Sequence, residues 1–276
     1  MRIITLLTDF GLRDPYVAEM KAVILSIFPE VRIVDISHEI QKFNVRMGAF
    51  VLASATPYFP PGTIHVAVVD PGVGTSRRPI IVEGERHIYV GPDNGVLMLA
   101  AEGDGIRHVY HITNPRYMLS RVSRTFHGRD IFAPAAAYLA MGVPPYMFGP
   151  EIQDYVTPRF ARVHRSNGTL HGEVLHIDGF GNVVSNISAE DLRGLGVCEG
   201  DALRVRLGGK SFTVRLCGAY GEVPRGELLA IIGSHDRLEI SVNQGSASER
   251  LGVRAGDPIQ VSPVGRVNPN VGDASF

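Results

Sequence analysis

In the N-terminal half of the chain, continuous apolar runs alternate with segments whose apolar residues recur at helical spacing. The continuous runs are typical of buried parallel strands, and they occupy residues 2–8, 32–37 and 63–69. The helical segments lie after Pro15, over residues 44–59 and over residues 128–142. Shorter strands and one further helix are predicted between residues 79 and 112. This succession predicts a layered α/β domain with a mostly parallel sheet and crossover helices.

The first helix carries its own start and stop signals. Asp14 is predicted as its N-cap and Pro15 as its first helical residue, positions that these residue types favour. Pro29 falls near its predicted end. The apolar residues that recur at helical spacing between these signals are Val17, Met20, Val23, Ile24 and Ile27.

The pattern changes near residue 160. From residue 172 onward come short runs rich in β-branched and apolar residues, separated by turn signals such as LGGKS and EVPRGE. This pattern predicts a small all-β domain, either a barrel or a sandwich. We therefore expect an N-terminal α/β domain over residues 1–162, a C-terminal all-β domain over residues 170–265 and a tail over residues 266–276.

Composition excludes several classes of partner. Of the 276 residues, 45% are hydrophobic and 20% are charged, as in an ordinary globular protein. The net charge of −1, without a run of like charges, argues against nucleic acid or an anionic membrane, because both require a basic face. Apolar runs such as TIHVAVV are too short to span a bilayer, and the N-terminus shows no signal-peptide pattern, so we expect a cytoplasmic protein. Cys198 and Cys217 lack CxxC spacing and give neither a disulfide framework nor a zinc site.

Polar clusters follow the predicted strands, at the sheet edge where open α/β sheets bind their ligands. The first cluster, TDFGLRD, places Asp9 just past the first strand and beside Gly11. A carboxylate there is suited to accept two hydrogen bonds from a ribose diol. Asp14 in the same loop is explained equally well by helix capping.

The second cluster is VVDPGVGTSRR, residues 68–78, which resembles a phosphate-binding loop at first sight. It lacks the Lys-Ser/Thr pair and the spacing of such loops, and a strand follows it instead of a helix. The glycines alone indicate a tight turn. A turn of this length can bring Arg77 back to Asp70, either as a functional pair or as a surface ion pair of little energetic weight.

The third cluster, RTFHGRDIFAP, places His127 just before a helix, with Gly128 allowing close backbone approach. A single histidine is more often structural than catalytic, and Asp130 is most simply a capping and macrodipole residue of the first helical turn. In the C-terminal half, IDGFGNVVSNIS offers Phe180 and Asn182. Asn182 and Asn186 are ordinary turn formers in one interpretation. In the other, the flat ring of Phe180 and the amide of Asn182 suit the face and edge of an adenine.

Together and in this order, the motifs resemble the S-adenosylmethionine hydrolase family, the hydroxide adenosyltransferases. The motifs are LTDFGLRDPYVAEMKAVI, VVDPGVGTSRR, VGPDNGVL, TFHGRDIFAPAAAYLAMG, IDGFGNVVSNI and GSHDRLEISVNQGSA, and the resemblance runs to about residue 265. It implies an N-terminal α/β domain, a C-terminal β-barrel and a homotrimer that binds substrate between neighbouring subunits. It also implies hydrolysis of S-adenosylmethionine to adenosine and methionine.

Carried over by position, the resemblance implies a catalytic set of Asp70, Arg77 and His127. Asp9 matches the position that binds the ribose hydroxyls, and Asp14 the position that holds the methionine end. The other implied substrate-binding residues are the wall residues Phe43 and Phe126, then Asp178, Phe180 and Asn182 from a partner subunit, and Tyr220, Ser234, Glu239 and Val242 on the adenine and methionine sides. The stretch His235-Asp236-Arg237 departs from the family pattern, where shorter and less charged residues stand.

The resemblance also bears on the nucleophile, because halogenating relatives lack the carboxylate at the Asp70 position and the His127-Gly128 pair. Water is therefore favoured over halide, with a halide adenosyltransferase or a non-catalytic binding protein as alternatives. The sulfonium substrate releases neutral methionine and needs no general acid, no metal and no cofactor. Arg77 remains protonated and would stabilise hydroxide-like charge. His127 is expected either to accept the proton of the water or to orient that water.

Overall fold

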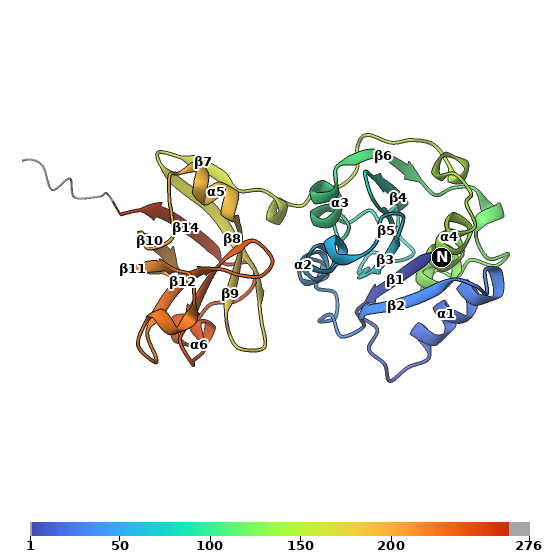
Figure 1. The fold of residues 1–276 in the computed structure, drawn as a ribbon. Helices are drawn as coiled ribbons and strands as arrows, with labels where there is room; N and C mark the ends of the chain where they lie inside the picture. Colours follow the sequence, from blue (N-terminus) through green and yellow to red (C-terminus); the bar gives the residue numbers. More distant parts are fainter. Residues whose placement is uncertain (1, 265–276) are drawn as a thin grey trace, which may run out of the picture. The chain divides into compact units, whose positions relative to one another are not determined.

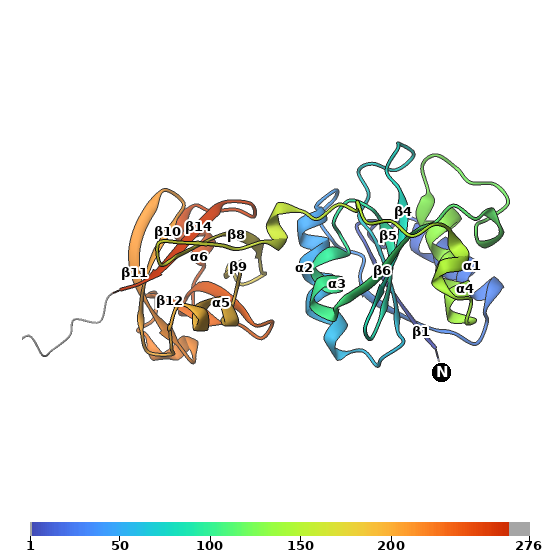
Figure 2. The same ribbon diagram turned by 90° about the horizontal axis from the view of Figure 1, so that it is seen from above.

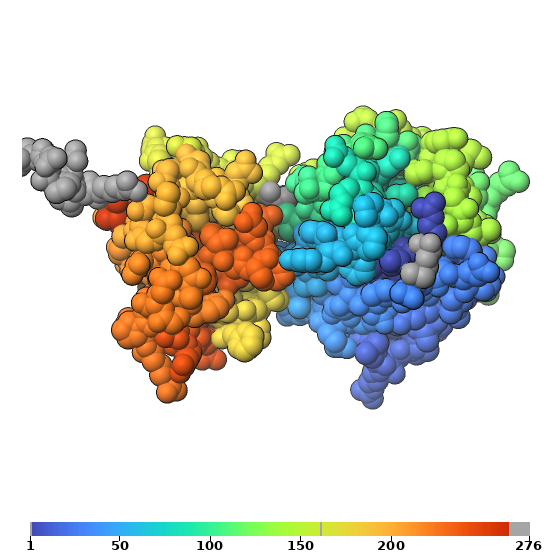
Figure 3. All heavy atoms as spheres, in the orientation of Figure 1, coloured from blue at the N-terminus to red at the C-terminus, as the bar shows by residue number. Residues whose placement is uncertain are grey.

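The structure, a computed structural model, describes residues 2–264. The chain divides into two compact units, one up to Ala161 and one from Arg162 onward. In the space-filling view the blue-to-green residues gather in one body and the yellow-to-red residues in the other (Figure 3). The expected tail, residues 266–276, lies outside the described residues.

The N-terminal unit is built around a six-stranded sheet with the order β2-β1-β3-β5-β4-β6 (Figure 1). The strands are β1 (Ile3–Thr8), β2 (Arg32–Ser37), β3 (Ile64–Val68), β4 (Pro79–Gly84), β5 (Ile88–Pro92) and β6 (Ile106–His111). Strands β2, β1, β3 and β5 pair in parallel, whereas β4 pairs antiparallel with both β5 and β6. The mostly parallel sheet expected from the apolar runs is confirmed.

Helices cover both faces of this sheet, as Figure 2 shows. Helices α1 (Tyr16–Ile27) and α4 (Ala133–Ala140) pack on one face, and α2 (Val45–Ala55) and α3 (Met98–Asp104) on the other. A strand covered on both faces must be apolar throughout, which is why all five residues of β3 are buried. The remaining helical turns are Thr56–Tyr58, Pro115–Tyr117, Pro145–Phe148, Arg159–Ala161 and the π-helical turn Gly128–Phe132.

The start of α1 differs from the expectation. Pro15, instead of Asp14, is the N-cap: its backbone is already helical, and its carbonyl accepts the N–H of Glu19 at 2.9 Å. No side chain caps the helix, and Asp14 is exposed. The proline ring fixes φ at a helical value. The Pro15 carbonyl can therefore begin the helical hydrogen bonds without help from the preceding carboxylate.

The C-terminal unit is a closed barrel, so the all-β expectation resolves to a barrel. Seven strands form the ring β14-β10-β11-β12-β13-β9-β8, and β14 pairs back onto β8, which also carries the short strand β7. The strands are β7 (His164–Ser166), β8 (Thr169–Ile177), β9 (Val183–Ser188), β10 (Ala202–Leu207), β11 (Lys210–Cys217), β12 (Leu228–Ile232), β13 (Arg237–Val242) and β14 (Pro258–Pro263). The helical segments are α5 (Ala189–Gly194), α6 (Ala247–Leu251) and the turn Tyr220–Glu222. Within residues 2–264, no helix is long and apolar enough to cross a membrane.

Candidate active site

A pocket of about 640 Å³ lies in the N-terminal unit, beyond the carboxyl ends of β1 and β3. The loop after β1 contributes Asp9, the loop after β3 contributes Asp70, and the segment before the π-helical turn contributes Phe126 and His127. Parallel strands direct their carboxyl ends to one edge of the sheet. The three polar clusters of the sequence therefore meet at one place.

The loop VVDPGVGTSRR is a chain of tight turns that returns toward its own beginning. Its backbone bonds include the N–H of Val73 to the carbonyl of Asp70 at 3.3 Å, and the Thr75 hydroxyl donates to the carbonyl of Gly72 at 2.7 Å. Gly74 has φ of +74°, and a Cβ there would lie 2.1 Å from the carbonyl oxygen of Arg124. Glycine is thus required at this position, because only its bare backbone permits the contact with the segment that carries His127.

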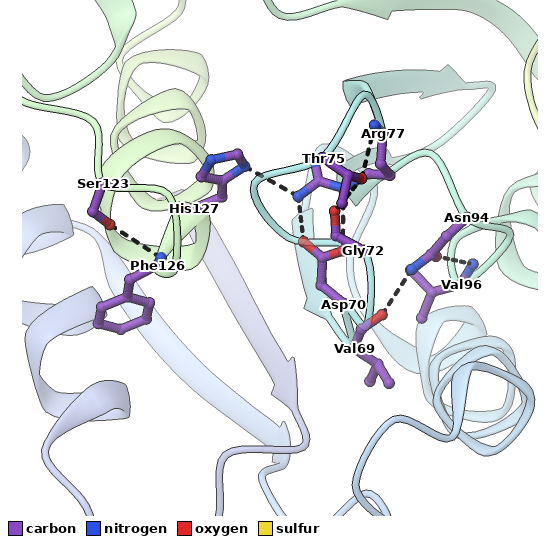
Figure 4. A network of polar contacts seen from close by, with 10 residues as sticks. All are labelled: Val69, Asp70, Gly72, Thr75, Arg77, Asn94, Val96, Ser123, Phe126 and His127. Atoms are coloured by element: carbon purple, nitrogen blue, oxygen red, sulfur yellow. Dashed lines mark hydrogen bonds and ion pairs between the residues drawn. The ribbon is translucent and has the colours of Figure 1, made fainter.

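Arg77 returns onto Asp70 and forms a two-pronged ion pair with it (Figure 4). Its Nε donates to Oδ1 of Asp70 at 3.1 Å, and its Nη2 donates to Oδ2. The side chains of Arg77 and Asp70 are only 7% and 5% exposed, so the surface ion pair is excluded. The guanidinium also lies over the ring of Phe132, 5.5 Å from its centre. A buried, bidentate pair of this kind fixes both groups in place.

His127 completes the set, because its Nδ1 lies 3.1 Å from Nη2 of Arg77 (Figure 4). A guanidinium can only donate, so Nδ1 must accept, and the ring is neutral with its proton on Nε2. Burial and the positive charge of Arg77 lower the pKa of His127 below its ordinary value, while the charges of Asp70 and Asp130 partly oppose this. The neutral imidazole is therefore the form present at neutral pH.

Asp9 lines the pocket and holds the loop that presents Phe43. Its side chain accepts the N–H of Phe43 through Oδ2 at 2.8 Å, and its carbonyl accepts a hydrogen bond from Lys42. Phe43 adopts φ of +64°, which is unfavourable for an aromatic residue, and its side chain is 69% exposed. Such strain persists only where the surroundings impose it, and it concentrates at functional sites.

The structure adds residues to the pocket that sequence reasoning missed. Tyr16, Glu19, Lys42 and Arg129 line it, and nothing in their local sequence pattern distinguishes them from surface residues of helices and loops. Asp14 is exposed and is not among the lining residues. The sequence made Asp14 a candidate because it lies in the same loop as Asp9, but in the structure its side chain is exposed to solvent.

In the C-terminal unit, Asp178 organises the turn between β8 and β9. Its Oδ1 accepts the N–H groups of Phe180 and Asn182, both at 2.9 Å, and its Oδ2 accepts the side-chain amide of Asn182 at 2.9 Å. This arrangement leaves the ring of Phe180 83% exposed. Asp178 and Asn182 are thus turn-forming residues, and the turn presents an aromatic ring.

The remaining candidate residues occupy different environments in the barrel. The Tyr220 hydroxyl donates to Glu239 at 3.2 Å; burial raises the pKa of Glu239, and burial and the Glu239 charge raise that of Tyr220 to about 12. Ser234 is exposed in the turn between β12 and β13. Val242 is part of the buried barrel core. Residues 2–264 contain no group of three or more His, Cys, Asp or Glu side chains arranged to hold a metal ion.

Comparison with known proteins covers nearly the whole chain. Residues 4–149 match the SAM hydroxide adenosyltransferase N-terminal domain, and residues 172–260 match the C-terminal domain of the same name. A protein of Thermus thermophilus named (R)-S-adenosyl-L-methionine hydrolase is 41% identical over 95% of this chain and 100% of its own length. A fluorinase of Nocardia brasiliensis is 30% identical over 94% of this chain and 96% of its own. The crystal structure of an uncharacterized conserved protein from Thermotoga maritima superposes with a TM-score of 0.85 at 43% identity, covering 94% of this chain and 99% of that one.

Proposed function

Because the chain belongs to the SAM hydroxide adenosyltransferase family, we propose that it hydrolyses S-adenosylmethionine to adenosine and L-methionine. Four relatives that are 36–41% identical carry the hydrolase name, which supports this assignment. The observation that carries it is the buried series Asp70–Arg77–His127 beside a pocket of about 640 Å³. A pocket of that volume is within the range that binds small molecules such as S-adenosylmethionine.

The chemistry requires an activated and positioned water. The water oxygen forms a bond to C5′ of the ribose while the C5′–S bond breaks, and the electron pair stays on sulfur, so methionine leaves as a neutral thioether. The water gives up one proton, to an acceptor of the site or to solvent, as its oxygen becomes the 5′-hydroxyl of adenosine. The leaving group needs no proton. The site must therefore hold the water in line with the C5′–S bond and stabilise the charge that develops on its oxygen.

Asp70 and Arg77 are suited to these two tasks. Asp70 lines the pocket, where its carboxylate accepts a hydrogen bond from the attacking water. Nη1 of Arg77 is buried and has no hydrogen-bond partner among the described residues. An orphaned buried donor is costly unless a bound group satisfies it. This supports a water molecule at the guanidinium, whose positive charge favours the hydroxide-like oxygen.

The geometry favours an orienting role for His127 over a proton-accepting one, because Arg77 occupies the lone pair of Nδ1. The variants His127→Asn and His127→Ala separate the two roles. An asparagine oxygen can accept from Arg77 near the Nδ1 position, but it cannot act as a base. If His127 orients Arg77, the Asn variant retains most of kcat while the Ala variant does not. If His127 is the base, both lose about 10²–10⁴-fold.

We propose further how the chain binds its substrate and how its subunits assemble. Asp9 binds the ribose diol, Phe43 and Phe126 form the walls, and Asp14 belongs to the loop at the methionine end. A partner subunit in a homotrimer supplies the recognition residues of the barrel, namely Asp178, Phe180, Asn182, Tyr220, Ser234, Glu239 and Val242. The exposed rings of Phe43 and Phe180 support this, since exposed aromatic residues are favoured at interfaces.

Mixing inactive subunits tests the shared site. Arg77→Ala inactivates the part of the site that the N-terminal unit contributes, and Asn182→Ala inactivates the part that the barrel of the neighbouring subunit contributes. After subunit exchange, a shared site recovers activity in mixed trimers because some sites combine two intact halves. A site contained within one subunit stays inactive in every mixture. Light scattering on the purified chain measures the oligomeric state independently.

The activity itself is tested by chromatography of S-adenosylmethionine incubated with the purified chain. Adenosine and methionine in equal amounts are expected. The relatives' names specify the (R) form, so the (R) and (S) sulfonium epimers are offered separately. Transfer to halide is the second candidate, because relatives that are 28–30% identical are fluorinases. A 5′-halo-adenosine formed with chloride or fluoride would establish it, although the Asp70 carboxylate repels a halide anion. Binding without turnover would indicate a non-catalytic binding protein.

A further inference from the structure

Asp130 is a buried carboxylate just outside the pocket, and the mechanism above does not use it. Its side chain is 0% exposed, and it does not line the pocket. Its Oδ2 accepts the backbone N–H of Ser123 at 2.7 Å, and its Oδ1 accepts Nε of Arg129 at 2.7 Å. Burial raises the pKa of Asp130, but the hydrogen bonds from Arg129 and Ser123 outweigh burial and leave the pKa below its ordinary value. The group is therefore charged at neutral pH.

These contacts differ from the capping role expected for Asp130. The N-cap position before the π-helical turn is His127, and no side chain caps the turn. The carboxylate reaches back to Ser123, seven residues earlier and outside the helix. π-helical turns are rare and are frequent at functional sites. The turn directly follows His127, so whatever fixes Asp130 also fixes the chain at His127.

Asp130 closes the loop that carries the pocket wall. Its backbone N–H donates to the carbonyl of Phe126 at 3.1 Å, and its carbonyl accepts the N–H of Leu119 at 2.9 Å. The hydroxyl of Ser123 accepts the N–H of Phe126 at 3.0 Å. Asp130 thus holds both ends and the middle of the segment 119–126. The backbone of Ser123 is also among the groups that act on the His127 ring.

The second partner of Asp130 extends the network to α1. Arg129 donates through Nη1 to Glu19 at 2.8 Å, and its guanidinium lies 5.0 Å from the centre of the Phe126 ring. Phe126 in turn makes edge-to-face contacts with Phe10 and Tyr16. Asp130 therefore holds Arg129 in the position where it supports the aromatic wall beside His127.

We propose that Asp130 is a positioning residue of the active site, which acts through Ser123 and Arg129 to keep His127 on Arg77 and Phe126 against the substrate. This rests on the proposed function, and it assigns a role to a residue that touches neither the substrate nor the reacting atoms. A loss of position by about 1 Å can lower a rate by about 100-fold. The effect is expected in kcat more than in KM, because the network aligns the reacting groups.

The chain offers a matched control for this test. Asp93 is a second buried carboxylate of the N-terminal unit with the same pattern of partners, one backbone N–H and one arginine. It accepts the N–H of Val156 at 2.8 Å and Nη2 of Arg78 at 2.7 Å, and its side chain is 3% exposed. It does not line the pocket. Asp93→Asn therefore measures the general effect of neutralising a buried, bonded aspartate.

The kinetic test compares Asp130→Asn, Asp130→Ala and Asp93→Asn with the wild type. We expect kcat to fall by about 10-fold for Asp130→Asn and about 100-fold for Asp130→Ala, with KM changing less than threefold and Asp93→Asn keeping kcat. Tyrosine fluorescence confirms that each variant is folded. If Asp130→Ala keeps the wild-type kcat, or if Asp93→Asn loses as much activity as Asp130→Asn, the positioning role is wrong.

A second readout does not depend on turnover. The ring of His127 is acted on by the charges of Arg77, Asp70 and Asp130, and Asp130 raises its pKa. In Asp130→Asn, the His127 ring signals in NMR, assigned with His127→Asn, are expected to titrate at a lower pH than in the wild type, and Asp93→Asn is not expected to move them. An unchanged titration overturns the proposal. If the wild type never releases adenosine but Asp130→Asn still shows this shift, only the proposed function is refuted.

Discussion

Removal of the Asp70 carboxylate is predicted to destabilise the N-terminal unit strongly, although we propose a catalytic role for Asp70. The pair it forms with Arg77 is almost completely buried, at 5% and 7% exposure. Asp70→Ala leaves the guanidinium charged and without its carboxylate. Breaking a buried ion pair from one side costs about 3–5 kcal/mol, against about 0–1 kcal/mol for an exposed pair. From the sequence alone, the pair could have been either exposed or buried, so either cost was possible.

Tyrosine fluorescence during urea unfolding measures this cost. The chain has no tryptophan, and of its nine tyrosines only Tyr220 lies beyond Ala161, so the signal reports the N-terminal unit. With a urea dependence of about 2 kcal/mol per molar, the midpoint is expected to fall by about 2 M. The double variant Asp70→Ala/Arg77→Met is expected to recover most of the loss, because no unpaired charge remains.

The matched control is Asp154→Ala, which breaks the exposed pair that Asp154 forms with Arg78 at 2.8 Å. Its midpoint is expected to stay at the wild-type value within error. If Asp70→Ala shifts the midpoint no more than Asp154→Ala does, the pair does not behave as a buried one. In that case Asp70 and Arg77 do not fix each other in place. A double variant no more stable than Asp70→Ala would also contradict the explanation by an unpaired charge.

Three further predictions concern other parts of the N-terminal unit. Burial and the positive charge of His87 lower the pKa of His65 from 6.5 to about 3, so the unfolded chain binds its proton more readily than the folded chain. The free energy of unfolding is therefore highest above pH 6.5 and falls toward pH 3, with a loss of about 2 kcal/mol at pH 5. In His65→Asn this contribution to the difference between the unfolding free energies at pH 7 and pH 5 is expected to disappear. Gly74→Ala places a Cβ against the carbonyl of Arg124. The free energy of unfolding is expected to fall by about 1–2 kcal/mol from the left-handed backbone alone, and kcat is expected to drop strongly, so wild-type kinetics would refute this prediction. Phe43→Asn relieves the strain at φ of +64° and is expected to raise the free energy of unfolding by about 0.5–1 kcal/mol. The same change is expected to raise KM for S-adenosylmethionine, and an unchanged KM would show that Phe43 is not part of the substrate wall.

The sequence by itself determined the secondary elements and the loops that carry the candidate site residues. The uniform apolar runs of β1 and β3 fix strands covered on both faces, because period and burial are local properties of the chain. Gly74 and its neighbours fix a tight turn after Asp70 for the same reason, since a left-handed backbone requires glycine. The exception was also local, because the N-cap of α1, expected at Asp14, is Pro15.

Only the tertiary structure decided what those residues do to one another. Arg77 and His127 stand 50 positions apart, and their contact depends on how two loops pack at the end of the sheet. That contact settles which nitrogen of His127 accepts, and burial settles that the Asp70–Arg77 pair is not a surface pair. Asp130 resembled a helix cap in the sequence, yet its carboxylate binds Ser123 and Arg129. Sequence periodicity specifies which face of an element is buried, whereas hydrogen-bond partners and protonation states are set by distances that exist only after packing.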